Sequence, residues 1–311
     1  MEKKKRKILI YLTAFTILAS SITYKLSKEK KDGLIQEIDE YLDSFQDDDF
    51  LICAHRAYQD GAIENTKEAI ICANENAFID YIEIDVRLTK DNQLVLSHDD
   101  ILLNKNQDSI NISSSILKFL LEEEYSYQSF SMMKKSLSDE EKTYLREKRR
   151  KLINKTYQLT SLLEGLKNNK KKVFLDLKYQ NNEKEFNEAL VNTLRGMDLS
   201  NIILQSNNRN GLIQIRQDLN INTCLIIDSK SDLKYENDFD YLCIRKSLIT
   251  YPLIEYFLNN GKTLAIWTIN DSKDLNNSFS KTKDYYKDII YITDYPDLIA
   301  TKLYQKEITK F

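Results

Sequence analysis

The residues best suited to proton transfer are the two histidines of this 311-residue chain. His55 and His98 each stand beside a charged residue and each ends an apolar run. A neutral imidazole accepts and gives up protons near neutral pH. A single histidine beside an apolar run is usually structural, whereas two histidines that bracket a pair of carboxylates predict a general acid and a general base.

Glu83 and Asp85 form that pair, and apolar residues flank both of them. Residues two apart in a strand point to the same face about 6.6 Å apart, from a rise of about 3.3 Å per residue. Two carboxylates on one interior face repel each other and are costly to bury unless a cation neutralises them. A divalent metal is the simplest explanation, and oxygen ligands favour Ca²⁺ or Mg²⁺ over zinc. Pairing with an arginine or lysine is the alternative.

Further segments carry side chains for the same site. Asp176 and Lys178 share a strand face, so Asp176 could add a metal ligand and Lys178 could hold a phosphate oxygen. Arg56 directly follows His55 and suits an anionic substrate oxygen. Trp267 ends another apolar run and is a candidate substrate contact, although a tryptophan at a strand end more often packs.

Short apolar runs alternate with helical patterns from Phe50 onward, and eight of them are the expected strands: 50–57, 81–88, 172–178, 202–206, 222–228, 241–245, 263–269 and 289–293. Most segments between them have apolar residues at helical spacing. Alternating strands and helices predict a parallel sheet, and eight such units in roughly 260 residues predict a closed (β/α)8 TIM barrel. An open, doubly wound sheet is the competing fold, but no glycine-rich fingerprint follows the first run.

Other parts of the chain lie outside this alternation. Residues 104–158 are rich in Lys, Glu, Ser and Tyr and too long for a barrel loop, which predicts a helical insertion or lid after the second strand. Residues 1–31 hold a basic cluster and an apolar run over 8–24, which predict one membrane span, a cytoplasmic N-terminus and an extracytoplasmic body. A cleaved signal that yields a secreted protein is the alternative. Residues 32–49 read as a stalk and short helix before the barrel domain at 50–311.

The body of the chain is acidic. The whole chain has a net charge of −3, but residues 1–31 carry nine Lys or Arg against two Glu, which leaves residues 32–311 at −10. Nucleic-acid binding would need a basic stripe, so nucleic acid is not an expected partner. An anionic ligand must be held by local cations or by a metal.

The cysteines predict buried thiols. Cys53, Cys72, Cys224 and Cys243 lie in apolar segments and have no metal-type spacing. A disulfide between Cys224 and Cys243 is the alternative in an oxidising compartment, because they fall on consecutive expected strands.

Taken in order, the motifs resemble those of the glycerophosphodiester phosphodiesterase family. That family has His-Arg, Glu-Asn-Thr, Glu-x-Asp, Thr-Lys-Asp and His-Asp motifs, followed by acid-x-Lys, Trp-Thr-x-Asn and Thr-Asp-x-Pro. The chain supplies His55-Arg56, Glu64-Asn65-Thr66, Glu83-Ile84-Asp85, Thr89-Lys90-Asp91, His98-Asp99, Asp176-Leu177-Lys178, Trp267-Thr268-Ile269-Asn270 and Thr293-Asp294-Tyr295-Pro296. The resemblance runs from about Leu51 to Leu303 and is densest at 55–99.

The resemblance implies a TIM-type barrel and metal-dependent hydrolysis of glycerophosphodiesters to glycerol phosphate and an alcohol. The implied roles are an acid/base pair, ligands of one Ca²⁺ or Mg²⁺, and phosphate contacts, and they fall in that order on His55 and His98, on Glu83, Asp85 and Asp176, and on Arg56 and Lys178. In the family mechanism a substrate hydroxyl next to the phosphate attacks phosphorus. Water then opens the cyclic phosphate while the histidines exchange roles.

Departures from the family pattern bear on the substrate. Ala57 replaces the usual Gly after His-Arg, Asp176 replaces a longer Glu, and Ser206-Asn207 replaces Ser-Phe. None removes a catalytic group, so we expect activity on a small, lipid or polymeric glycerophosphodiester, including a glycerophosphate polymer of the cell envelope. The alternatives are phospholipase D-like activity on lysophospholipids and a catalytically silent barrel that serves as a surface binding or assembly module.

Overall fold

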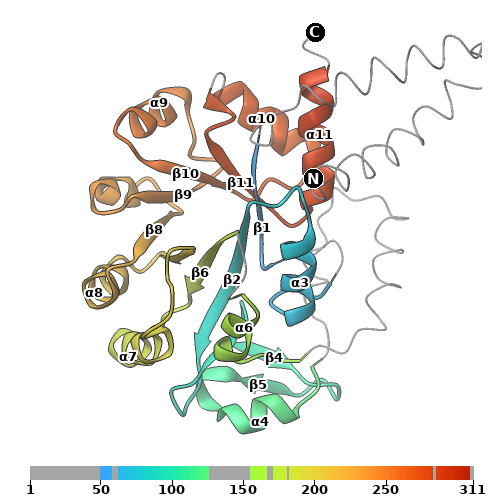
Figure 1. Cartoon of the computed structure of the whole chain (residues 1–311), viewed down its shortest axis with the longest axis vertical. Helices are drawn as coiled ribbons and strands as arrows, with labels where there is room; N and C mark the ends of the chain where they lie inside the picture. Colours follow the sequence, from blue (N-terminus) through green and yellow to red (C-terminus); the bar gives the residue numbers. More distant parts are fainter. Residues whose placement is uncertain are drawn as a thin grey trace, which may run out of the picture. The chain divides into compact units, whose positions relative to one another are not determined.

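The computed structural model describes residues 50–57, 62–125, 155–166, 171–180, 182–282 and 285–308 (Figure 1). All of them belong to one unit of the chain, Phe50–Phe311. The predicted membrane span at 8–24 and the predicted stalk at 32–49 lie outside the described residues. None of the helices described is long and apolar enough to cross a membrane.

Eight parallel strands form a closed barrel: β1 (Leu51–Ala54), β2 (Tyr81–Leu88), β6 (Lys172–Leu177), β7 (Ile202–Ser206), β8 (Asn222–Ile227), β9 (Tyr241–Arg245), β10 (Thr263–Trp267) and β11 (Ile289–Thr293). Neighbours in this order pair with each other, and β11 pairs with β1, which closes the ring. The (β/α)8 barrel predicted from the alternation is confirmed, and each expected strand is present.

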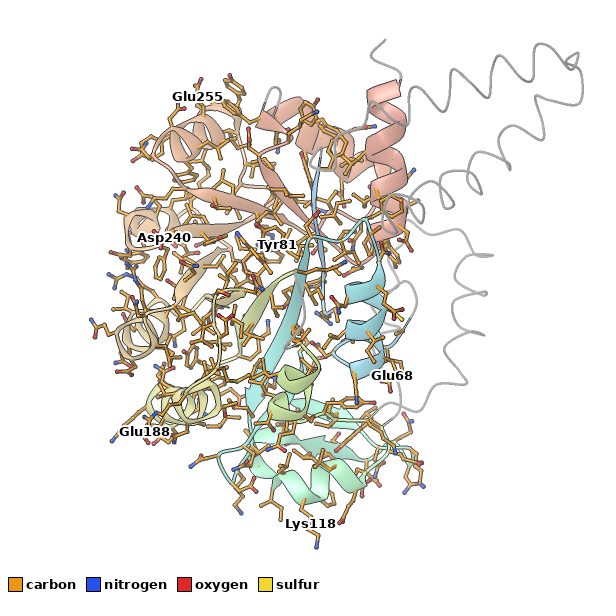
Figure 2. All side chains as sticks on the ribbon, in the orientation of Figure 1. Glu68, Tyr81, Lys118, Glu188, Asp240 and Glu255 are labelled. Carbon is orange, nitrogen blue, oxygen red and sulfur yellow. The ribbon has the colours of Figure 1, made fainter. Side chains whose placement is uncertain are left out.

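Helices follow most of the barrel strands and cover the outside of the sheet (Figure 1): α3 (Lys67–Glu75), α6 (Leu159–Gly165), α7 (Glu183–Leu194), α8 (Arg209–Leu219), α9 (Tyr251–Asn259), α10 (Ser272–Thr282) and α11 (Pro296–Ile308). Between β8 and β9 the chain forms a 3-10 helix, η3 (Asp232–Asp238). Thr66 begins α3 as its N-cap, because its hydroxyl accepts a hydrogen bond from the Ala69 N–H at 3.2 Å. Charged side chains such as Glu188 and Glu255 project from α7 and α9, whereas Tyr81 lies among the strands (Figure 2).

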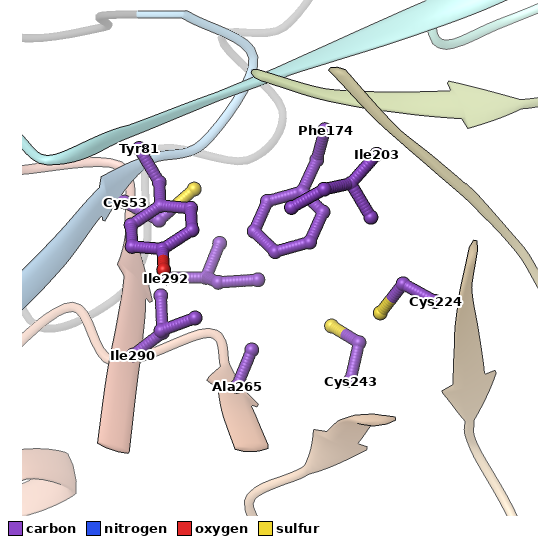
Figure 3. Close-up of a cluster of buried hydrophobic side chains, with 9 residues drawn as sticks. All are labelled: Cys53, Tyr81, Phe174, Ile203, Cys224, Cys243, Ala265, Ile290 and Ile292. Carbon is purple, nitrogen blue, oxygen red and sulfur yellow. The ribbon is translucent and has the colours of Figure 1, made fainter. Parts of the chain in front are cut away.

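Inward-facing side chains fill the barrel below the carboxyl ends of its strands. The interior cluster contains Cys53, Tyr81, Phe174, Ile203, Cys224, Cys243, Ala265, Ile290 and Ile292 (Figure 3). The rings of Tyr81 and Phe174 stack with centroids 5.4 Å apart. The barrel is therefore a packed core, and the inward-facing residues nearer the carboxyl ends of the strands rest on it.

The cysteines of the barrel interior form no disulfide in this structure. Cys53, Cys224 and Cys243 are buried free thiols, and Cys72 in α3 is half-buried. Burial is the main cause that raises the pKa of the Cys53 and Cys243 thiols. The structure thus agrees with the prediction of buried thiols for Cys53, Cys224 and Cys243 but not for Cys72, and it does not contain the alternative Cys224–Cys243 disulfide.

The insertion after the second barrel strand contains strands as well as helices in its described part. It comprises β3 (Leu94–Leu96), β4 (Ile101–Leu103), β5 (Ser109–Asn111), η1 (Ile112–Ser114) and α4 (Leu117–Glu122). β3 pairs antiparallel with the end of β2, and β4 pairs antiparallel with β5. The expected helical insertion at 104–158 is therefore mixed over 104–125, and its residues 126–154 lie outside the described part of the chain.

A tight turn explains why the chain reverses after β2. The Thr89 N–H donates to the Gln93 carbonyl at 2.9 Å, and the Gln93 N–H donates back to the Thr89 hydroxyl at 2.9 Å. Asn92 lies between them with a φ of 56°, a left-handed conformation that asparagine tolerates better than most residues. These local hydrogen bonds form a hairpin that the spacing of apolar residues does not predict.

Gly211 in α8 lies against Tyr179, which directly follows the site residue Lys178. A Cβ at Gly211 would lie 2.6 Å from Cζ of the Tyr179 ring. That ring is held by a 2.6 Å hydrogen bond from its hydroxyl to Asn187 Oδ1 and by contact with Phe186. In most helices Gly→Ala is stabilising by about 1 kcal/mol. Here we expect Gly211→Ala to lower the free energy of unfolding by about 1–3 kcal/mol, measured by urea denaturation, because the ring must move.

A matched variant on the same helix controls for this effect. Gln217 is exposed on α8, so Gln217→Ala should change the free energy of unfolding by no more than about 0.5 kcal/mol. A Gly211→Ala protein that is as stable as the wild type, or more stable, would contradict the packing described for Tyr179.

Candidate active site

An acidic cluster lies at the carboxyl ends of two neighbouring barrel strands. It consists of Glu83 and Asp85 from β2 and Asp176 from β6, and all three are buried. Asp85 and Asp176 are register partners. Each of the three residues offers an oxygen atom, and these atoms lie within 4.8 Å of one another. Among the described residues, these three form the group of acidic side chains whose oxygen atoms lie close enough together to bind one metal ion.

Two cations lie against the cluster. The Lys178 ammonium is 2.6 Å from Asp176 Oδ2 and 2.9 Å from Asp85 Oδ1. Arg56 Nε is 3.8 Å from Asp85 Oδ2, and Arg56 Nη1 is 2.9 Å from Glu64 Oε1. The structure thus contains the ion pairs with arginine and lysine that were one alternative, and it also brings the carboxylates into the single cluster that the metal alternative requires. With Glu64 the site holds four carboxyl groups and two cations, so the acidic groups outnumber the basic ones.

The cluster fits a hard divalent cation. Glu83 Oε1 is buried and has no hydrogen-bond partner among the described residues, although buried carboxylate oxygens are normally satisfied. Burial, followed by repulsion from Asp85 and Asp176, raises the pKa of the Glu83 carboxyl. A bound cation would satisfy this oxygen and remove the repulsion. A set of carboxylate oxygens is the ligand chemistry that Ca²⁺ and Mg²⁺ prefer.

The Asp85 carboxyl is shifted in the opposite direction. Burial alone would raise its pKa, but the Lys178 ammonium and the Arg56 guanidinium outweigh burial and lower the pKa of Asp85. The imidazoles of His98 and His55 act in the same direction. Asp85 is thus held ionised at the centre of the site, with both histidines near it.

A left-handed turn brings Arg56 into the barrel. The φ angles of Arg56 and Ala57 are 53° and 75°. Their N–H groups donate to Glu83 Oε2 at 2.7 Å and to the Glu83 carbonyl at 2.6 Å. Strand alternation would turn Arg56 away from His55, and this loop redirects it. The positive φ also explains why glycine is usual where this chain has Ala57, because glycine adopts that conformation without a steric cost.

Asn65 fixes the position of Asp85. The Asn65 amide donates to Asp85 Oδ2 at 2.7 Å, and the Asp85 N–H donates to Asn65 Oδ1 at 2.9 Å. The Asn65 N–H also donates to the Arg56 carbonyl at 2.9 Å. The Glu-Asn-Thr segment therefore positions the site: Glu64 pairs with Arg56, Asn65 holds Asp85, and Thr66 caps α3. Sequence reasoning predicted a helix start at Asn65-Thr66 but did not find the roles of Glu64 and Asn65.

His55 is oriented by a carboxylate from the last barrel strand. Its Nδ1 is 2.5 Å from Asp294 Oδ1, and its Nε2 is 3.9 Å from Glu83 Oε2. Asn270 donates to the other oxygen of Asp294 and accepts from the Asp294 N–H at 2.9 Å. A carboxylate on Nδ1 fixes the ring and leaves Nε2 toward the acidic cluster. Sequence reasoning assigned no role to Asp294 and Asn270. The signal that could have found them is that both are polar residues within the last two motifs.

His98 reaches the site from the hairpin after β2. The apolar run before it forms β3, which pairs antiparallel with β2 and is not a barrel strand. The Ser97 N–H donates to the Asp85 carbonyl at 3.2 Å, and Arg87 donates to the His98 carbonyl from Nε at 3.0 Å and Nη2 at 2.6 Å. His98 Nδ1 is 2.8 Å from Asp99 Oδ1. The side chains of His98 and Asp99 are 29% and 63% exposed, so this histidine lies on the solvent side.

Trp267 ends β10 and packs against the barrel interior. Its Nε1 donates to the Cys243 carbonyl at 3.2 Å. The indole N–H is therefore used within the barrel, and what Trp267 offers to a substrate is the surface of its ring. Its role as a substrate contact stays a prediction.

The sequence profile of the Glycerophosphoryl diester phosphodiesterase family matches residues 55–298 of this chain. A curated relative, the uncharacterized protein MG293 of Mycoplasma genitalium, is 55% identical over 53 residues. That match covers 17% of this chain and 21% of the relative. The shared stretch is thus short, whereas the family match spans most of the chain.

Solved structures show the same fold. A phosphodiesterase from Oleispira antarctica, in complex with the product sn-glycerol-3-phosphate, is 21% identical with a TM-score of 0.63, over 81% of this chain and 96% of the other. A glycerophosphodiester phosphodiesterase from Parabacteroides distasonis is 20% identical with a TM-score of 0.60, over 84% and 99%. These structures support the barrel, and the profile match confirms the resemblance carried by the motifs. The chain therefore belongs to the glycerophosphoryl diester phosphodiesterase family, and it is a phosphoric diester hydrolase.

Proposed function

We propose that this enzyme depends on one divalent cation, Ca²⁺ or Mg²⁺, and cleaves glycerophosphodiesters to glycerol phosphate and an alcohol by histidine acid/base catalysis. The observation that carries the proposal is the buried cluster of Glu83, Asp85 and Asp176, with an oriented His55 at its edge. A cation held by these three carboxylates supplies positive charge to the oxygens of the phosphate.

His55 is the proposed base. Asp294, whose side chain is only 15% exposed, accepts the Nδ1 proton of His55 and so fixes the ring with Nε2 toward the acidic cluster. Nε2 of His55 then takes the proton of the glycerol hydroxyl next to the phosphate. The hydroxyl oxygen forms a bond to phosphorus, and the bond between phosphorus and the leaving alcohol breaks.

His98 is the proposed acid. It lies on the solvent side, where the alcohol must leave, and it donates a proton to the leaving oxygen. Water then opens the cyclic phosphate while His55 and His98 exchange roles. Arg56 Nε is buried and has no hydrogen-bond partner among the described residues, so it is available to donate to a phosphate oxygen. Lys178 adds a second positive charge.

For the physiological substrate we propose an extracytoplasmic glycerophosphodiester, including a glycerophosphate polymer of the cell envelope. The basic cluster before the apolar run at 8–24 supports a membrane anchor and an external barrel. Asn207 is exposed directly after β7, where the family has phenylalanine, and its polar side chain suits a hydrophilic alcohol. The Oleispira antarctica phosphodiesterase was solved with sn-glycerol-3-phosphate, which agrees with glycerol phosphate as the product here.

His55→Ala and His98→Ala should each reduce turnover by about 10²-fold or more, because each variant loses a proton-transfer group. The purified full chain and both variants are incubated with glycerophosphocholine, a lysophospholipid and a glycerophosphate polymer, and the products are identified by mass spectrometry. Thermal unfolding verifies that the variants fold, and Gln217→Ala serves as the surface control. Wild-type rates in either histidine variant reject its assignment, and turnover of the lysophospholipid alone favours the phospholipase D-like alternative.

Removal of divalent metal should abolish turnover, because the buried carboxylates lose their neutralising charge and the phosphate loses its cation. Activity of the chelator-treated full chain is measured before and after addition of Ca²⁺ or Mg²⁺, and one of them should restore it. Asp176→Asn should weaken the restoration. Asp228→Asn should not, because Asp228 is an exposed carboxylate paired with Arg245 just after β8. Full activity of the metal-free enzyme is incompatible with the proposal.

A further inference from the structure

One polar side chain of the barrel interior has no role in the scheme above. Gln205 of β7 is only 3% exposed, and its amide Oε1 has no hydrogen-bond partner among the described residues. A buried amide oxygen without a partner costs free energy, and in native proteins such groups are uncommon. The position of Gln205 suggests what satisfies it.

Gln205 continues the register row of the acidic cluster. Asp85 is the register partner of Asp176, and Asp176 is the register partner of Gln205. Phe174 and Ile203, two residues earlier on the same strands, point into the barrel interior and lie side by side (Figure 3). Because side chains alternate along a strand, Asp176 and Gln205 point inward as well. The amide thus stands beside Asp176, at the level of the acidic cluster.

The opposite neighbour gives the amide no polar partner of comparable strength. Gln205 is the register partner of Cys224 on β8, and the Cys224 thiol is buried in the interior cluster. A thiol is a weak hydrogen-bond donor. The side of Gln205 that faces Asp176 is therefore where a partner for Oε1 can lie.

We propose that Gln205 is a further ligand of the divalent cation, which it binds through its amide oxygen. The inference rests on the proposed metal dependence. Ca²⁺ takes six to eight oxygen ligands, amide carbonyls among them, so three carboxylates leave positions open. Asp176 is one methylene shorter than the glutamate usual in the family, and its Oδ2 is engaged by Lys178. A neutral oxygen from the adjacent strand adds a ligand without further charge repulsion.

The experiment is a calorimetric titration of Ca²⁺, and separately of Mg²⁺, into the chelator-treated full chain. Gln205→Met keeps a side chain of similar length but removes the oxygen, and it should weaken binding of the cation that the wild type prefers by about 10-fold. Gln205→Glu keeps an oxygen at this place and should bind at least as tightly as the wild type. Gln217→Ala, exposed on α8, should bind as the wild type does.

Thermal unfolding separates a ligand role from a packing role. Without metal, Gln205→Met should unfold at or above the wild-type temperature, since an unpaired buried amide is replaced by an apolar group. The increase in unfolding temperature on addition of metal should be smaller than in the wild type.

Three results would overturn the inference. Equal affinities of the wild type and Gln205→Met for the cation would overturn only the role of Gln205 and would leave the proposed metal dependence intact. Loss of affinity in Gln205→Glu as well as in Gln205→Met, with lower metal-free stability of both, would assign Gln205 to packing. A wild-type chain that binds neither cation would overturn both proposals.

Discussion

Repulsion among three buried carboxylates is the constraint on which the site depends. Parallel pairing of β2 with β6 brings Glu83, Asp85 and Asp176 together above the packed interior of the barrel. Like charges at this spacing are unfavourable in a low-dielectric interior unless cations compensate them. Lys178 compensates Asp85 and Asp176 directly. Burial, followed by repulsion from Asp85 and Asp176, raises the pKa of Glu83, and a divalent cation bound by the cluster would oppose both effects.

A ring of neutral and charged side chains holds the reactive groups in place. Asn65 fixes Asp85, and Asn270 fixes Asp294, which in turn orients His55. Such partners matter because proton transfer and phosphate binding need donors and acceptors that are already aligned. The two asparagines come from the loop after β1 and the segment after β10. The contact between His55 and Asp294 links β1 to β11, the two strands that close the barrel.

The sequence predicted the barrel because its apolar runs alternate with helical patterns, and the carboxyl ends of parallel strands meet at one mouth. That rule also brings Glu83 and Asp176 together. Other features depend on geometry that no periodicity encodes. Arg56 turns inward through a left-handed φ, and Asp294 reaches His55 only after the ring closes between β11 and β1. The insertion at 104–158 was expected to be helical, but its described part also contains the strand β5, which pairs antiparallel with β4.

The central claim is that the acidic cluster binds one divalent cation, and anomalous X-ray diffraction tests it most directly. Crystals of the full chain grown with Ca²⁺ are measured at a wavelength where calcium scatters anomalously. We expect one anomalous peak about 2.3–2.6 Å from oxygens of Glu83, Asp85 and Asp176. A map without a peak there, with the Lys178 ammonium still bridging Asp85 and Asp176, would contradict it.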